Sequence, residues 1–412
     1  MPHSPDGPWP DGPWPDGPWL TIIGIGEDGL ESLSSAAREA LEDAALIMGA
    51  PRHLALLPAL RAETLNWPVP FEEGVQALLS RRGKPTVMLA SGDPFWFGAG
   101  ASVTRHLEQQ EWTAHPAPST FTLAAARLGW PLQDTKCHGL HAAPLTRLRP
   151  SLVPGRRAIL LLRDGSAVGE LATWLKAQGF GASTIHVLEA LGGPRERVRQ
   201  GTADMLDLAD IAHPVAVGLF VAGEGRTLPR CSGIPDLWFD HDGQITKRPA
   251  RALTLSALAP RPGETLWDIG AGSGSIAIEW LLAHPSTAAI AFEADPERAV
   301  RARANALSLG ADRLTVIEGR APDILNGQPR PDAIFIGGGL SQSLLETLFA
   351  LPGGPTRLVA NAVTLESETL LAQWHAAKGG ELLRIELAQA VPLGTRRGWR
   401  SAYPLVQWSV TL

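Results

Sequence analysis

The sequence contains only two cysteines among its 412 residues, Cys137 and Cys231, and they stand far apart. Isolated cysteines form neither a disulfide framework nor the paired ligand spacing of a zinc site. They fit the reducing conditions of the cytoplasm, where disulfides are rare. We therefore expect a cytoplasmic protein without a metal site.

Long apolar runs and an excess of basic charge are also missing. No uninterrupted apolar stretch approaches the length that crosses a bilayer, and the N-terminus lacks the apolar core of a signal peptide. The formal net charge is −6, which provides no global attraction for nucleic acid. The composition thus predicts neither a membrane partner nor a nucleic-acid partner.

The chain is long for a single hydrophobic core, and two domains are the expectation for 412 residues. Apolar residues make up 44% of the chain and charged residues 19%, as in ordinary folded proteins. The first residues differ, because they carry a threefold PDGPW repeat. Proline and glycine at this density form neither a helix nor a strand ladder. We predict a disordered tail over residues 1–18.

The clearest pattern in the chain runs from Leu266 to Asp295. An apolar run meets a glycine-rich turn, a helical apolar pattern follows over 276–282, and a second apolar run ends on Glu293. This order predicts strand, tight turn, helix, strand and carboxylate, which is where a doubly wound sheet binds a nucleotide. Glycines let backbone N–H groups approach such a ligand, and Glu293 can accept hydrogen bonds from ribose hydroxyls.

Two nucleotide-binding families compete for this stretch. The NAD fingerprint requires G-x-G-x-x-G, but Ser275 occupies the third glycine position. The glycines instead run G-x-G-x-G shortly after Asp268, which resembles the class I S-adenosylmethionine (SAM) methyltransferases. A glycine-rich turn without any ligand is the remaining alternative. By the resemblance, the residues that contact SAM are Gly270, Ala271, Gly272, Ser273, Gly274 and Glu293.

The C-terminal residues continue the α/β pattern. They predict a seven-stranded sheet whose last strand is antiparallel, the arrangement of class I methyltransferases. A stretch rich in glycine, proline and aspartate precedes this domain, and we interpret it as a linker over 226–244 before a domain over 245–412. Beyond the glycine turn and its flanking strands, the expected elements are helices at 249–258 and 296–309 and strands at 314–318, 332–336, 357–360, 382–391 and 404–410.

Details of this half resemble the decarboxylating C-methyltransferases of the cobalamin pathway. In that family a threonine just before the first helix contacts SAM, and the corresponding residue here is Thr246. The EGRAPD segment matches the adenine-side loop of the family and places Ala321 there. Three glycines, 337–339, stand where amino-methylating enzymes carry D/N-PPY. Their presence argues against an N-methyltransferase that acts on nucleic acid or protein.

The N-terminal half also alternates apolar runs with helical segments, which indicates an α/β domain over 19–225. Ser34 is a candidate N-cap for a helix that we expect to continue to Met48. A second helix should end at Leu128. The expected strands are 20–25, 85–90, 157–162 and 215–221.

Five motifs follow one another in this half: GIGEDGLESLS, ASGDPFWFG, PAPSTFTLAAARLGW, the pair His138-Gly139, and LEALGGPRERV. In this order they resemble the tetrapyrrole methylase family, in its cobalamin-pathway branch. The resemblance implies two α/β lobes with SAM in the cleft between them. Glu27 departs from the family, in which proline is usual at this position. Carried over residue by residue, the SAM contacts are Ser91, Gly92, Asp93, Trp96, Ser119 and Thr120.

Several conspicuous residues keep a second interpretation. Asp93-Pro94 by itself would be an ordinary turn, and His138 and His141 fit hydrogen-bonding loop groups as well as catalysts. We therefore assign no catalytic residue from the sequence. Two basic groups are candidates for binding substrate carboxylates, with solvated surface as the alternative. These groups are Arg396, Arg397 and Arg400, and Lys247, Arg248 and Arg251.

The two resemblances together imply a function. They imply SAM-dependent C-methylation of a reduced precorrin, at C-5 by the N-terminal half and at C-15 by the C-terminal half. The C-terminal half would also decarboxylate the ring C acetate, giving precorrin-8X in cobalamin biosynthesis. The partners implied are a small-molecule tetrapyrrole and further copies of the chain, joined through the C-terminal domain. The alternatives are an RNA methyltransferase that uses the C-terminal domain and a binding protein without enzymatic activity.

Overall fold

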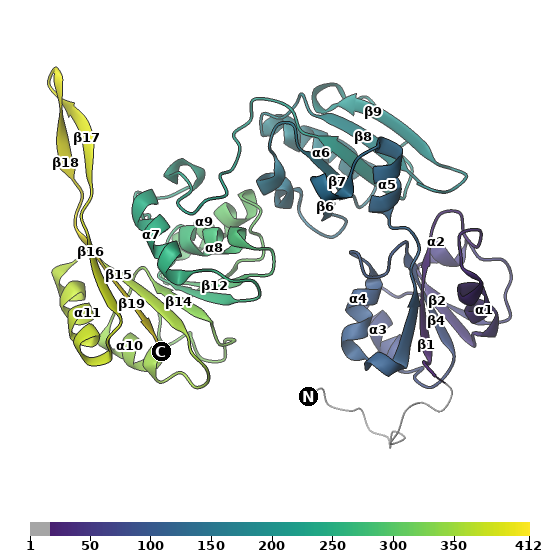
Figure 1. Ribbon diagram of the computed structural model, residues 1–412, viewed down its shortest axis with the longest axis horizontal. Coiled ribbons are helices and arrows are strands. Elements are labelled where there is room, and N and C mark those ends of the chain that lie inside the picture. The colour runs from purple at the N-terminus through teal and green to yellow at the C-terminus, as the bar shows by residue number, and fades with distance from the viewer. Residues whose placement is uncertain (1–16) are drawn as a thin grey trace. The chain divides into compact units, whose positions relative to one another are not determined.

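The computed structural model describes residues 17–412 (Figure 1). The predicted tail, residues 1–18, lies outside the described residues except for Gly17 and Pro18. The described chain divides into two compact units. The first comprises the residues up to Ala143 together with Val153–Arg226, and the second comprises Pro144–Leu152 and Thr227–Leu412.

The first unit begins with a lobe built on a five-stranded parallel sheet, in the order β3-β2-β4-β1-β5. Helix α1 packs on one face of this sheet and α3 on the other. Both faces are covered, as the near-continuous apolar runs of its central strands require. The elements are β1 (Leu20–Ile25), α1 (Ser35–Asp43), β2 (Leu46–Gly49), α2 (Pro51–Leu54), β3 (Glu63–Asn66), α3 (Phe71–Leu79), β4 (Thr86–Ser91), α4 (Ala99–Val103) and β5 (Trp112–His115).

The predicted helix from Ser34 to Met48 is wrong in its C-terminal part. Ser34 does cap α1, because its hydroxyl accepts a hydrogen bond from the Ala37 N–H, but the helix ends at Asp43. Leu46–Gly49 forms β2 instead, whose residues are all buried and which pairs with β3 and β4. Pairing on both edges, together with burial, outweighs the helical propensity of this apolar run.

The second lobe of this unit holds a mixed five-stranded sheet in the order β6-β7-β10-β8-β9. Strands β6 and β7 run parallel, and the other neighbours run antiparallel. Helix α5 ends at Leu128 as predicted and packs on the sheet through Phe121 and Ala124. The elements are α5 (Thr120–Leu128), β6 (Thr135–Gly139), β7 (Arg157–Leu161), α6 (Ser166–Ala177), β8 (Thr184–Glu189), β9 (Arg197–Thr202) and β10 (Val215–Phe220).

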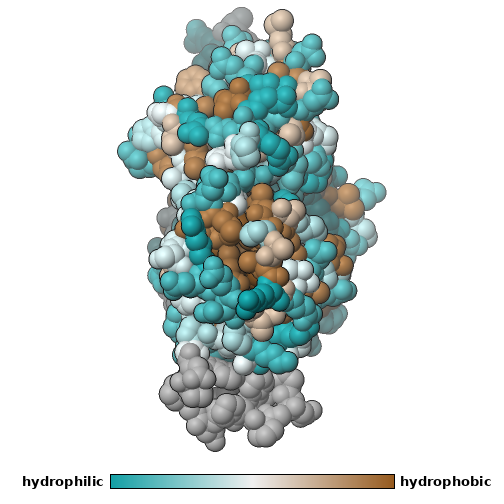
Figure 2. Space-filling model, turned by 90° about the vertical axis from the view of Figure 1, so that its right-hand side faces the viewer, coloured by the Kyte–Doolittle hydropathy of each residue, from teal (hydrophilic) through white to brown (hydrophobic). Residues whose placement is uncertain are grey.

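Part of the first lobe's core reaches the surface. Leu30, Leu54 and Leu56 pack against the cluster beneath α1 but are only partly buried. Figure 2 shows apolar residues grouped within a mostly hydrophilic surface. The first unit therefore presents an apolar area to solvent in addition to its internal core.

The second unit contains the predicted seven-stranded sheet, in the order β13-β12-β11-β14-β15-β19-β16. The last strand, β19, runs antiparallel to both of its neighbours, so the predicted arrangement is confirmed. Helices α7, α8 and α9 pack on one face of the sheet, and α10 and α11 pack on the other. The elements are α7 (Arg248–Leu258), β11 (Thr265–Ile269), α8 (Ser275–Ala283), β12 (Ala288–Glu293), α9 (Pro296–Ser308), β13 (Thr315–Glu318), β14 (Ala333–Ile336), α10 (Gln342–Phe349), β15 (Arg357–Ala362), α11 (Leu365–Lys378), β16 (Glu381–Ile385) and β19 (Leu405–Thr411).

The single strand expected over 382–391 is wrong, because the chain leaves the sheet within it. Strand β16 ends at Ile385, and β17 (Ala388–Leu393) begins a hairpin with β18 (Arg396–Ser401). Figure 1 shows this hairpin projecting from the second unit. Within residues 17–412, β17 and β18 form a separate two-stranded sheet. The apolar pattern could not reveal that the register with β19 stops at Ile385.

The stretch interpreted as a linker, residues 226–244, packs closely against the second unit. Leu228, Ile234 and Phe239 are buried in its core. Glu279 on α8 accepts hydrogen bonds from the backbone N–H groups of Gly233 at 2.6 Å and Ile234 at 3.0 Å. These contacts fix the path by which the chain enters the second unit.

Candidate functional site

A cavity of about 1040 Å³ lies at the carboxyl ends of β11, β12 and β14 in the second unit. Gly274 lies behind the turn, where an added Cβ would stand 3.1 Å from the Cβ of Ala302 on α9. The other predicted SAM contacts of this half all line the cavity: Thr246, Gly270, Ala271, Gly272, Ser273, Glu293 and Ala321.

The glycine turn leaves room for a ligand because two loops approach each other without side chains. Gly270 has φ +71°, and an added Cβ would stand 2.6 Å from the backbone nitrogen of Gly338, in the loop after β14. Gly272 has φ +57°, and the nearest atom to an added Cβ is the Gln244 carbonyl oxygen at 3.8 Å. Glycine is therefore required at residue 270 by both space and backbone, and at 272 by backbone alone.

Glu293 is held firmly at the end of β12. Its Oε2 accepts a hydrogen bond from the Gly272 N–H at 2.7 Å, and its Oε1 accepts one from the Asp295 N–H at 2.9 Å. The side chain is buried, and each carboxylate oxygen keeps a second lone pair. The carboxylate thus presents fixed acceptors at the cavity wall, where hydroxyl donors of a ligand can reach them.

Asp268, on β11, lies directly behind this turn. Its Oδ2 accepts a hydrogen bond from the Ala277 N–H at 3.0 Å, while Oδ1 has no hydrogen-bond partner among the described residues. Burial raises the pKa of Asp268 to about 7, and the nearby charge of Glu293 adds to the rise. Near neutral pH this carboxyl group is therefore close to half protonated.

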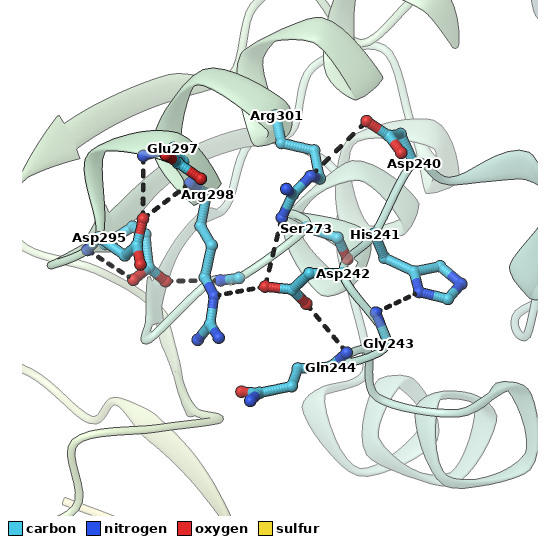
Figure 3. Close-up of polar contacts among 12 residues, drawn as sticks. Asp240, His241, Asp242, Gly243, Gln244, Ser273, Asp295, Glu297, Arg298 and Arg301 are labelled. Carbon is cyan, nitrogen blue, oxygen red and sulfur yellow. Dashed lines mark hydrogen bonds and ion pairs between the residues drawn. The ribbon is translucent and has the colours of Figure 1, made fainter.

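Ion pairs hold the entry segment at the rim of the same cavity. Figure 3 shows Arg298 and Arg301 reaching from α9 toward Asp242, with Gln244 next to it. The Arg298 Nε donates to Asp242 Oδ2 at 2.9 Å, and the Arg301 Nη1 lies 3.4 Å from the same oxygen. Arg301 also pairs with Asp240, at 3.6 Å. These pairs position residues 240–244 so that Gln244 and the following residues, up to Thr246, reach the cavity wall.

The two basic groups of this unit differ in environment. Arg251 is fully buried and donates to Glu279 at 2.5 Å and to Asp236 at 3.0 Å, so both interpretations offered for it, substrate partner and solvated surface, are wrong. Lys247 and Arg248 are exposed, and Lys247 lines the cavity. The other group is exposed on strand β18: Arg396, Arg397 and Arg400.

A second cavity, of about 680 Å³, lies in the first unit and is lined by residues of both lobes. It collects the ends of β1 and β4, the loop before α5, and parts of β7 and β10. All predicted SAM contacts of this half line it: Ser91, Gly92, Asp93, Trp96, Ser119 and Thr120.

Close backbone contacts shape this cavity. An added Cβ at Gly24 would stand 1.8 Å from the Gly92 carbonyl oxygen, which accepts a hydrogen bond from the Ala117 N–H at 3.1 Å. Ser119 caps α5 by accepting a hydrogen bond from the Thr122 N–H at 3.1 Å. The Asp93 carboxylate accepts one from the Phe95 N–H at 2.8 Å, which closes its turn. The motif loops predicted from the sequence therefore lie close together and contact one another through backbone atoms.

Sequence reasoning missed a polar group beside Ser91. The His53 Nε2 lies 3.1 Å from the Ser91 hydroxyl oxygen, which also accepts a hydrogen bond from Arg52. Burial, together with the neighbouring Arg52 charge, lowers the pKa of His53 to about 3, so this imidazole is neutral at physiological pH. Glu27 pairs with Arg52 at 2.8 Å, and its departure from the family pattern was the one available signal.

The structure also bears on metals and membranes. Among residues 17–412, no three or more histidine, cysteine, aspartate or glutamate side chains are grouped so as to hold a metal ion. Nor does any helix in that range combine the length and apolar character needed to span a bilayer. Both cysteines are free thiols, Cys231 exposed and Cys137 half-buried.

Known proteins match both halves of the chain. Residues 19–207 match the tetrapyrrole (corrin/porphyrin) methylases, and residues 237–412 match the precorrin methyltransferase domain. A Sinorhizobium sp. protein named precorrin-6Y C(5,15)-methyltransferase (decarboxylating) is 50% identical over 397 residues, 95% of this chain and 96% of its own length. The chain belongs to this family. A family member from Mycobacterium tuberculosis (strain CDC 1551 / Oshkosh) is 44% identical over 404 residues, 95% of this chain and 99% of its own.

One solved structure is similar to part of the chain. A crystal structure of the C-terminal domain of precorrin-6Y C5,15-methyltransferase from Rhodobacter capsulatus is 52% identical and covers 45% of this chain and 100% of its own, with a TM-score of 0.43. As a member of this family, the chain is a decarboxylating methyltransferase. These relatives lend no support to an RNA methyltransferase.

Proposed function

We propose that this enzyme methylates precorrin-6Y at C-5 and C-15 and removes the ring C acetate carboxyl group as CO2, with SAM as the donor in both transfers. The first unit acts at C-5, and the second acts at C-15 and in the decarboxylation. One observation carries the proposal. Each unit holds its own cavity, lined by the residues that its family motif assigns to SAM, with the exception of Gly274.

The second cavity fits SAM. The open space at Gly272 suits a ligand that packs against bare backbone, which an added carboxylate would fill. The fixed acceptors of Glu293 suit the ribose hydroxyls, and Thr246 and Ala321 lie in the same wall. We propose that these residues, with the rest of the glycine turn, hold the donor in this unit.

The first cavity fits SAM in a different way. Gly92 has φ +52°, and an added Cβ would stand 2.9 Å from the Pro118 carbonyl oxygen, so the two motif loops meet closely. Trp96 adds an aromatic face whose ring centre lies 5.2 Å from that of Phe121. We propose that the donor lies against these loops, in contact with Asp93 and Thr120.

The reaction requires little acid–base catalysis from the side chains of the protein. Bound SAM would supply a methyl group on a positively charged sulfur. The reacting carbon of a reduced tetrapyrrole is an electron-rich enamine carbon, so no strong general base is needed. The cavity walls must align this carbon with the methyl group and exclude water. In the second unit, Ile269, Phe292 and Phe335 supply apolar surface that keeps water out. After loss of CO2 the conjugated macrocycle accepts the electron pair, and a proton is then added.

Two further predictions accompany this function. We propose a homo-oligomer formed through the second unit, because Leu393, Trp399 and Tyr403 are large apolar or aromatic side chains left 69%, 78% and 88% exposed on or beside the projecting hairpin. A cytoplasmic location also stays a prediction, based on the two unpaired cysteines.

The function is tested on the full chain with labelled SAM and chemically reduced precorrin-6. The expected product carries two added methyl groups and has lost one CO2, as read by mass spectrometry. Gly272→Asp should abolish the reactions of the second unit, because its carboxylate would enter the open space where the donor is proposed to lie. A product that lacks either new methyl group from the wild-type chain contradicts the proposal.

Gly327→Asp is the matched control. Gly327 has φ +78°, lies in the same unit, and has no atom within 4 Å of an added Cβ. It therefore carries the same backbone cost as Gly272→Asp without touching the cavity. Equal loss of activity in both variants would assign the effect to folding and not to the donor site.

A further inference from the structure

Glu27 links two arginines that come from the two lobes of the first unit. The Arg52 Nη1, on α2, donates to Glu27 Oε1 at 2.8 Å, and the Arg195 Nη2, in the loop between β8 and β9, donates to Glu27 Oε2 at 3.1 Å. Glu27 and Arg52 line the cavity of this unit. The Glu27 side chain is only 10% exposed, so its charge is largely withdrawn from bulk water.

The loop that carries Arg195 is shaped to make this contact. An added Cβ at Gly193 would stand 2.5 Å from the Glu27 Cβ, so the loop packs directly on Glu27. Glu196 accepts a hydrogen bond from the Gly192 N–H at 2.7 Å and another from Arg127 at 3.0 Å. The loop is therefore anchored at both sides of Arg195 before any ligand is present.

Glu27, Arg52 and Arg195 carry one excess positive charge between them, beside a cavity lining in which Arg52 and Arg163 are matched by Glu27 and Asp93. Arg52 and Arg195 share a single carboxylate, whereas Arg163, another lining residue, pairs with both Asp164 and Glu170. The remaining carboxylate in the lining, Asp93, lies in the turn after β4. His53 adds no positive charge, since burial keeps its imidazole neutral.

The arginines also keep donors for a ligand. A guanidinium has five N–H donors in a fixed fork that matches a carboxylate. Arg195 is 63% exposed and uses one nitrogen for Glu27, which leaves most of its fork open. Arg52 uses its two terminal nitrogens for Glu27 and Ser91, and is held in one orientation by them. One arginine is thus presented to solvent and the other is fixed in the wall.

We propose that Arg52 and Arg195, oriented by Glu27, form a subsite that binds a carboxylate side chain of the tetrapyrrole in the first unit. Glu27 is a positioning residue, because it acts through the two guanidinium groups. The inference rests on the proposed function, in which an anionic tetrapyrrole enters this cavity.

The test uses Arg195→Gln and Arg52→Gln in the full chain. Each replaces a charged guanidinium group by a shorter, neutral amide that is still polar. We expect the KM for the tetrapyrrole at the first-unit step to rise at least about tenfold, the loss expected for one charge-assisted carboxylate contact. The donor affinity of Arg195→Gln, measured by equilibrium titration, should stay within about twofold, because Arg195 touches none of the proposed donor contacts. The product with one new methyl group should accumulate, because the second unit is untouched.

Arg81→Gln is the matched control. Arg81 lies in the same lobe, has the same 34% side-chain exposure as Arg52, and also pairs with a glutamate, Glu63. Arg81 lies outside the cavity lining and, unlike Arg195, does not pair with the lining residue Glu27, so its substitution should leave KM unchanged. The KM of the wild type should also rise with salt more steeply than that of Arg195→Gln, because screening acts on the charges that the variant lacks.

Glu27→Gln distinguishes two roles for Glu27: orienting the two arginines for substrate binding, or only stabilising the fold by joining the two lobes. A positioning role predicts a higher KM with an unchanged rate at saturating substrate. A purely structural role predicts a lower melting temperature and an unchanged KM. If Arg195→Gln and Glu27→Gln alter only stability, the subsite is excluded while the proposed function stands. If the wild-type chain transfers no methyl group to the precorrin, the proposed function itself fails.

Discussion

Two neighbouring carboxyl groups, Glu293 and Asp268, differ in the number of backbone N–H groups that they accept from. Glu293 accepts two backbone N–H groups and is held at the cavity wall. Asp268 accepts one, and its other oxygen is buried without a partner among the described residues. Burial raises the pKa of Asp268 to about 7, whereas an exposed aspartate titrates near 3.9. Ionising Asp268 therefore costs free energy in the folded ligand-free protein.

This difference predicts a pH dependence of stability. The folded state keeps the Asp268 proton to a higher pH than the unfolded state, so the stabilising contribution is complete below about pH 4 and is lost as the pH rises through 7. Between pH 5 and 7 we expect the wild type to lose roughly 2–3 kcal/mol relative to Asp268→Asn. Hydrogen exchange of the β11 amides in the ligand-free chain measures this, and parallel curves for the two proteins would refute it.

Among the elements, the β17–β18 hairpin is the one that packs least against the rest of its unit. Its strands pair with each other, and most of its side chains are exposed. An isolated two-stranded hairpin is marginally stable in water. Its base lines the second cavity through Leu387 and Ala402, whose backbones are joined by a hydrogen bond of 2.8 Å. A second copy of the chain is the cover that we propose for it.

Replacing residues 388–401 by a short turn tests that role. Because the hairpin buries little within its own unit, the unfolding free energy of that unit should change by less than about 1 kcal/mol. The mass in solution, measured by sedimentation, should fall to that of one chain. An unchanged assembly would place the contact on another surface, and a large loss of stability would mean that the hairpin packs on its own unit.

At the scale of the whole molecule, each unit has its own sheets, its own core and its own cavity. The two units are not separated at a single position in the sequence. Pro144–Leu152 belongs to the second unit although residues of the first unit flank it on both sides. Arg147 in this segment donates to Asp312 at 2.8 Å, which ties it to the loop after α9.

Two cavities predict two donor sites. Calorimetric titration of the full chain with SAM should give two equivalents per chain, and Gly272→Asp should reduce this to one. The Gly327→Asp control should keep both. A single equivalent in the wild type would mean that one unit has lost its donor site, and the assignment of one methyl transfer to each unit would then be wrong.

Elements whose signals are local could be predicted from the sequence alone. The turn from β11 to α8 was predicted correctly because positive-φ glycines, the apolar periodicity and the terminal carboxylate all lie within 30 residues and act on the same backbone. The motif order in the first unit likewise placed its loops. These features depend on neighbours in the chain, which the sequence displays directly.

Tertiary structure decided the features that depend on distant partners. Residues 46–49 became a strand because β3 and β4 flank them, although their own pattern favours a helix. Glu27 meets Arg195 across 168 residues of sequence. Such contacts require two lobes to pack, and neither propensity nor periodicity encodes which surface loops will then lie together. The carboxylate subsite that we propose depends on that packing.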